Sequence, residues 1–216
     1  DQKFEKLDNG SGWVLTGNNF DNTSDANNKF LGTTTWHSLY LRVNDKQIAE
    51  FDPHGGIAIG FNTKADWAGI AIGDAATITA DEAVAIGKNA KSGSRAISLG
   101  NGSKATSDES IGLGFNAIST GSKASAIGHS ALASANQSVA IGQSALSSGN
   151  SSLAIGTNSQ STQNKSIAIG DGSKAIANES FALGSNAQSA SDQGLAIGVG
   201  AQTTNQQNAF AIGVNA

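Results

Sequence analysis

A repeating order of apolar and small residues dominates the chain from residue 55 onward. A large apolar residue, a small residue, a second large apolar residue and a glycine form a tetrad, first seen as Ile57-Ala58-Ile59-Gly60. Twelve copies follow one another, with successive glycines 13 to 15 residues apart and mostly 14 apart. So short and regular a period predicts a solenoid, in which each repeat is one coil.

Each repeat carries the pattern of two short strands. The large-small-large order of the tetrad has a period of two, which is typical of a strand that buries one face. A weaker alternation of small residues follows the glycine, as at Ala145 and Ser147, and predicts a second strand with little room on its inner side. We expect the residue six positions before the repeat glycine to form a tight corner, because its side chain can hydrogen-bond its own backbone and it tolerates a left-handed conformation. These turn formers are Asp81, Ser94, Asp108, Ser122, Asn136, Asn150, Asn164, Asn178 and Asp192. Frequent glycine and β-branched residues oppose a helix.

A coil of about 14 residues encloses too little apolar surface to offset its backbone entropy, so we expect apolar surface to be buried between chains. The large residues of successive tetrads form a continuous apolar column, and columns of that size mark interfaces. Parallel copies packed on this column would close as a cyclic homo-oligomer. We therefore assign to the core of the roll and of the assembly Val84, Ile86, Ile97, Leu99, Ile111, Leu113, Ile127, Val139, Ile141, Leu153, Ile155, Ile167, Ile169, Phe181, Leu183, Leu195 and Ile197.

The segments Ser138-Val139-Ala140-Ile141-Gly142 and Ser166-Ile167-Ala168-Ile169-Gly170 carry a resemblance to a known family. Over residues 55–216 the chain resembles the 14-residue head repeats of trimeric autotransporter adhesins, of the YadA-like head type. The resemblance implies an all-β, left-handed parallel β-roll in each chain, bundled as a homotrimer. It also implies a head on an outer-membrane-anchored fibre at the cell surface, attaching to extracellular matrix proteins, host cells, other bacteria or abiotic surfaces. A structural spacer without a ligand of its own is the alternative function.

Residues 1–54 do not repeat and are rich in aromatic side chains. Leu39–Val43 and Gln47–Phe51, separated by a polar turn, predict a β-hairpin. We expect this segment to cap the solenoid end, where strand edges and core would otherwise be exposed. A binding tip is the other interpretation, because exposed aromatic residues are favoured contacts. The candidate cap or ligand surface comprises Trp13, Trp36, Tyr40 and, just inside the repeats, Trp67.

Composition narrows the chemistry further. The chain has no Cys, and its three His (His37, His54 and His129) stand at no ligand spacing, so we expect no metal, no cofactor and no enzyme activity. A net charge of −4 gives no basis for nucleic-acid binding. A left-handed β-helix acyltransferase is disfavoured because its rungs have six residues, and 14 is not a multiple of six. An ice-binding solenoid is disfavoured because threonine does not occur in regular ranks on one face. A recurring lysine four residues after the repeat glycine (Lys64, Lys91, Lys104 and Lys174) predicts a solvated row that keeps the head soluble, and a basic stripe is the alternative.

The sequence has no run long enough for a membrane helix and no signal peptide. The absence of Met, and a last residue (Ala216) three positions past a repeat glycine, predict a piece of a longer protein. Any membrane attachment is therefore expected from segments outside this sequence.

Overall fold

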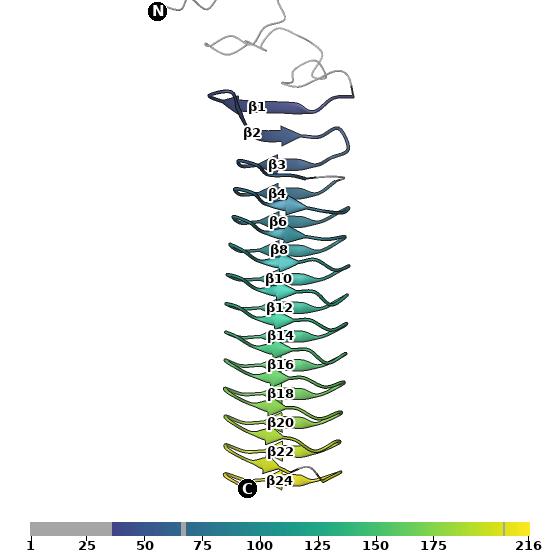
Figure 1. Ribbon diagram of the computed structural model, residues 1–216, viewed down its shortest axis with the longest axis vertical. Coiled ribbons are helices and arrows are strands. Elements are labelled where there is room, and N and C mark those ends of the chain that lie inside the picture. The colour runs from purple at the N-terminus through teal and green to yellow at the C-terminus, as the bar shows by residue number, and fades with distance from the viewer. Residues whose placement is uncertain (1–35, 66–67, 205) are drawn as a thin grey trace, which may run out of the picture. The chain divides into compact units, whose positions relative to one another are not determined.

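The repeats fold as a stack of coils that together build two sheets (Figure 1). The structure, a computed structural model, describes residues 36–65, 68–204 and 206–216. Within that part all regular elements are strands, with no helix, and Trp36–Ala216 form one compact unit. The expectation of an all-β solenoid with 14-residue coils is confirmed.

The first sheet, called sheet A, has 14 strands in the order β1-β2-β3-β4-β6 and then every even-numbered strand to β24. Two come from the hairpin and the other twelve from the tetrads. Their bounds are β1 Leu39–Val43, β2 Lys46–Phe51, β3 Ile57–Ile59, β4 Ile70–Ile72, β6 Val84–Ile86, β8 Ile97–Leu99, β10 Ile111–Leu113, β12 Ser125–Ile127, β14 Val139–Ile141, β16 Leu153–Ile155, β18 Ile167–Ile169, β20 Phe181–Leu183, β22 Leu195–Ile197 and β24 Phe210–Ile212.

The second sheet, called sheet B, has 10 strands of two residues each. Each lies between two consecutive strands of sheet A and pairs in parallel with its counterpart in the next coil. The bounds are β5 Thr77–Ile78, β7 Lys91–Ser92, β9 Lys104–Ala105, β11 Ile118–Ser119, β13 Leu132–Ala133, β15 Leu146–Ser147, β17 Gln160–Ser161, β19 Lys174–Ala175, β21 Gln188–Ser189 and β23 Gln202–Thr203.

Strands of neighbouring coils pair without any shift, so each side chain stacks on the equivalent one of the next coil. Val139 pairs with Leu153, Ala140 with Ala154 and Ile141 with Ile155. The 13-residue spacing before Gly100 does not disturb this register, since Val84 still pairs with Ile97. The missing residue is absorbed in the turn after β7, where the amide of Gly93 donates to the carbonyl of Ala105.

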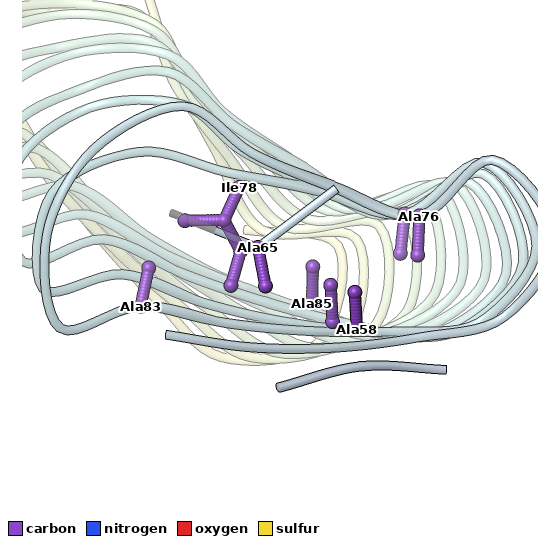
Figure 2. Close-up of a cluster of buried hydrophobic side chains, with 8 residues drawn as sticks. Ala58, Ala65, Ala76, Ile78, Ala83 and Ala85 are labelled. Carbon is purple, nitrogen blue, oxygen red and sulfur yellow. The ribbon is translucent and has the colours of Figure 1, made fainter. Parts of the chain in front are cut away.

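Small residues alone line most of the interior between the two sheets. The middle residue of the tetrad points inward, and Ala140, for example, has an exposed fraction of 0%. Figure 2 shows how Ala58 and Ala85 face Ile78 and Ala76 across the narrow space near the first coils. Of the described residues, Ile78 is the one large aliphatic side chain among the fully buried ones.

This arrangement corrects part of the sequence-based assignment. The 17 large tetrad residues do not form the inside of the roll; each is half-buried or exposed on the outer face of sheet A. The physical reason is width. Two sheets closed by 14-residue coils leave space for a methyl or a hydroxyl, so the small middle residue must face inward and the strand places its large neighbours outward. Whether they pack between chains stays a prediction.

Overfilling this interior should destabilise the protein strongly. We expect Ala140→Leu to lower the free energy of unfolding by about 1–3 kcal/mol or more, because the added atoms meet a close-packed wall. Val139→Leu is the matched control: Val139 points outward, and Leu153 and Leu195 already occupy that tetrad position. Thermal unfolding followed by circular dichroism measures both. Equal melting temperatures for the two variants would contradict the assignment of Ala140 to the interior.

Buried serines line the interior together with the alanines, and their hydroxyls donate hydrogen bonds to nearby backbone carbonyls. Ser152 Oγ donates to the carbonyl of Gly149 at 2.6 Å, and Ser159 Oγ donates to the carbonyl of Gly156 at 2.9 Å. Because each acceptor lies three residues back in the same turn, a serine can replace alanine inside without leaving an unpaired polar group. Among the described residues, Ser119 Oγ is the buried side-chain atom without a hydrogen-bond partner.

The corner before each tetrad differs in detail from the expectation. The left-handed backbone conformation falls one residue later than the turn formers, as at Lys123, Gln137 and Lys165. Two of the Asn side chains bond to the preceding coil: Asn136 Oδ1 accepts from the amide of Ser122 at 3.1 Å, and Asn164 Oδ1 accepts from the amide of Asn150 at 3.2 Å. Stacking in register makes this possible, because the equivalent backbone amide of the preceding coil lies directly beside each side chain.

At the N-terminal end, β1 and β2 form an antiparallel hairpin over the residues for which the sequence predicted one. Asn44 and Asp45 at its tip both have positive φ, as a two-residue hairpin turn requires. Strand β2 pairs antiparallel with β3, so Ala49 lies opposite Ile59. The edge of the first coil in sheet A is therefore covered by the hairpin.

Candidate functional surfaces

The most extensive feature of the outer surface is an apolar stripe along sheet A. We define the aliphatic stripe as the 17 tetrad residues of β6 to β22 named above, sixteen aliphatic residues and Phe181, which project outward from strands stacked in register. Four of these side chains are exposed, with 38% for Ile86 and 37% for Leu99, and the other thirteen are half-buried. Ser125, in β12, is the polar residue that interrupts the column. The stripe gives the chain one continuous face suited to burial against an apolar surface.

Sheet B presents a mixed outer face. Its first outward position carries Lys91 and Lys104, then Ile118, Leu132 and Leu146 in three successive coils, then polar residues. The three aliphatic side chains are half-buried. Sequence analysis singled out the lysines of this column but not these aliphatic residues, since their apolar run is confined to three coils.

The turns before the tetrads carry a row of complementary charges. Arg95 forms ion pairs with Asp108 at 2.6 Å and with Glu109 at 3.2 Å, and Lys165 pairs with Glu179 at 3.1 Å. A hydrogen bond from Gln193 and the Lys165 ammonium hold the pKa of the Glu179 carboxyl below its ordinary value. These exposed contacts each join neighbouring coils, and such pairs contribute little individually.

The predicted aromatic surface is only partly within the described residues. Trp36 has an exposed fraction of 72% and makes an edge contact with His54, with ring centroids 5.5 Å apart. Tyr40, in β1, is 46% exposed. Trp13 and Trp67 lie outside the described residues. Trp36 and Tyr40 are thus accessible side chains at the hairpin end of this unit.

Two further aromatic contacts were not anticipated. Phe115 and His129 occupy the position after the repeat glycine in adjacent coils and stack with ring centroids 5.2 Å apart. The Lys46 ammonium lies 5.3 Å from the ring centre of Phe61. The stacking partner one coil away could have been found by aligning the repeats and looking for aromatic neighbours in the same column.

Two open hollows lie on the described surface. A hollow of about 360 Å³ lies between β2 and the first coil, lined by Lys46, Glu50, Phe61 and Lys64 among others. A second, of about 470 Å³, follows the turns at Asn150, Asn164 and Asn178. Among the described residues no three His, Cys, Asp or Glu side chains gather as a metal site would require.

The same part of the chain contains no helix long and apolar enough to cross a membrane. A comparison with curated proteins found no match. A family model described as "YadA head domain repeat (2 copies)" matches at residues 92–117, 119–145, 147–173, 164–187, 175–201 and 190–216.

These matches cover more than half of the 216 residues and coincide with the coils described above. The tetrads, the 14-residue coil and the small-residue interior extend to β3, ahead of the matched range. The family is one of adhesin-type surface proteins. The chain belongs to the YadA head domain repeat family.

Proposed function

We propose that the chain is the head of a homotrimeric adhesin that attaches a bacterial surface to extracellular matrix proteins, cells or abiotic material. The observation that supports this proposal most directly is the aliphatic stripe, because its large apolar side chains lie outside the roll. Soluble proteins rarely expose a contiguous apolar face of that length without covering it. A second and third copy of the same chain supply a matching face.

The repeat geometry favours a parallel arrangement of copies. Coils stacked in register place equivalent side chains at a constant step, so parallel chains align every coil of one stripe with a coil of its neighbour. A cyclic arrangement closes and hides all the stripes around one axis. The count of three chains and the left-handed winding of each roll rest on the family resemblance.

The remaining surfaces then face outward and repeat along the head in three copies. Shallow contacts repeated in this way give strong attachment through multivalency, without a deep pocket in any chain. The hairpin with Trp36 and Tyr40 stands at the end of the coils, where it serves as a cap and as an exposed aromatic surface. Anchoring in an outer membrane would come from other segments of the whole protein.

The test measures the mass of the assembly in solution and the adhesion of beads coated with the chain. Size exclusion coupled to light scattering should give about 65 kDa, three times the 21.7 kDa of one chain. Beads coated with the chain should adhere to collagen, fibronectin or plastic, while beads coated with heat-unfolded chain should not. A mass near one chain would contradict the trimer. If the chain is a trimer but the coated beads adhere neither to these surfaces nor to cells, the spacer function is favoured.

A further inference from the structure

Three lysines form a short column at the N-terminal end of sheet B. Lys64 pairs in register with Thr77, Thr77 with Lys91, and Lys91 with Lys104. All three lysines are exposed. At about 4.8 Å per coil, the column from Lys64 to Lys104 spans roughly 14 Å along the stacking direction.

This column is not neutralised by the protein. The turn lysines have carboxylate neighbours: Lys88 lies 3.7 Å from Asp74, Lys123 lies 3.9 Å from Glu109 and Lys165 is paired with Glu179. Lys64, Lys91 and Lys104 form no ion pair with any described residue, and no described outward position of sheet B carries a carboxylate. Glu50 lines the same hollow as Lys64 but forms no ion pair with it, and its carboxylate accepts a hydrogen bond from the Gln47 side chain.

Folding alone does not account for the column. Lys91 and Lys104 are direct neighbours in adjacent parallel strands, where like charges destabilise a sheet. Equivalent positions of later coils hold Gln160, Gln188 and Gln202, with one further lysine, Lys174, between Gln160 and Gln188, so the same backbone forms without the charge. In a chain whose net charge is −4, an unpaired basic column on one flat face is a local feature that favours an anionic partner.

The chemistry of the face narrows the kind of partner. The exposed hydroxyls of Thr106 and Thr120 lie at the neighbouring outward position, where they can hydrogen-bond to a polar ligand. The described outward positions of sheet B hold no aromatic side chain on which bases could stack, which disfavours single-stranded nucleic acid. A flat face with a repeating step suits an extended polymer better than a compact small molecule.

We propose that Lys64, Lys91 and Lys104 bind an anionic polysaccharide, with sulfate or carboxylate groups along the chain of sugars. Sheet B lies on the opposite side of the roll from the aliphatic stripe, so assembly through the stripe leaves the column accessible. Three copies around the axis multiply a weak contact. This inference rests on the proposed attachment function and names one class of surface that the head recognises.

The experiment uses heparin, a sulfated polysaccharide, immobilised on a column, with elution by a salt gradient. The test variant is K64Q/K91Q/K104Q, which introduces glutamine, the residue that other coils already carry at this position. The matched control is K88Q/K123Q/K165Q, which removes the same three charges from the turns. We expect the wild type and the control to be retained and the test variant to lose about tenfold in affinity, as three solvent-exposed charge contacts would give. Retention should fall as salt rises.

The outcomes separate this inference from the proposed function. An equal loss in both triple variants would overturn the inference, because net charge alone would then explain binding. Failure of the wild type to bind heparin, while its beads still adhere to matrix or cells, would also overturn it and leave the attachment function standing. Binding to heparin with no adhesion to any cell or matrix surface would instead contradict the attachment function.

Discussion

Replacing Ile141 with Asp is expected to dissociate the assembled head into separate chains or to unfold it. Ile141 lies near the middle of the aliphatic stripe, in register with Ile127 on one side and Ile155 on the other. In a closed trimer each such position occurs three times around the axis. Three carboxylates would be moved from water into an apolar interface without partners, at a cost of several kcal/mol each.

Light scattering gives the mass of the variant, and circular dichroism its melting temperature. The matched control is Leu146→Asp, which changes a half-buried aliphatic residue of the adjacent strand β15 on the outer face of sheet B. We expect the control to keep the mass of the wild type. If both variants remain trimeric with unchanged melting, the stripe is not the interface between chains.

Replacing Gly142 with Ala is expected to disrupt the stacking of coils, at a cost of about 3 kcal/mol or more. Gly142 has φ near +133°, a conformation that residues with a side chain rarely adopt. A Cβ atom there would also lie 2.5 Å from the carbonyl oxygen of Gly156 in the next coil. Both the backbone and the neighbouring coil would have to move, and neither has a flexible side chain to give way.

A second glycine provides the control for this variant. Gly172 has φ near +64°, the left-handed region that Asn tolerates, and Asn158 and Asn186 occupy the equivalent place in neighbouring coils. A Cβ atom at Gly172 would lie 2.5 Å from Asn186 Oδ1, which is the end of a side chain that can turn aside. We therefore expect Gly172→Asn to change the free energy of unfolding by about 1 kcal/mol or less. Chemical denaturation measures both variants. A Gly142→Ala protein as stable as Gly172→Asn would show that the close approach to Gly156 is not a constraint.

Much of the fold follows from sequence because the information is repeated in every coil. The tetrad predicted the strands of sheet A, and the small alternation around Ala145 and Ser147 predicted sheet B. Turn formers such as Asn136 marked the corner correctly. The hydrogen-bond partner of Asn136 was predicted wrongly, because an Asn side chain can satisfy a backbone amide of its own turn or of the preceding coil, and local propensity does not distinguish the two.

Some features of the candidate surfaces could be predicted from the sequence and others could not. The apolar column of sheet A could be listed residue by residue from the repeat, since its members share one position. The sequence could not predict that Lys91 and Lys104 have no carboxylate neighbour. That depends on which turn carries each acidic residue and on which side of the coil the turn lies. The stack of Phe115 on His129 likewise joins residues of two different coils.

The sequence by itself determined the period, the two strands per coil and the apolar column, because each is a pattern along the chain. Only the tertiary structure decided which face of the tetrad strand lies inside. A period of two is the same whether Ala140 or Ile141 points inward, and hydrophobicity alone favours the larger residue. The narrow gap between two sheets closed by so short a coil excludes that choice, so the alanines and serines fill the interior and the large aliphatic residues are left outside.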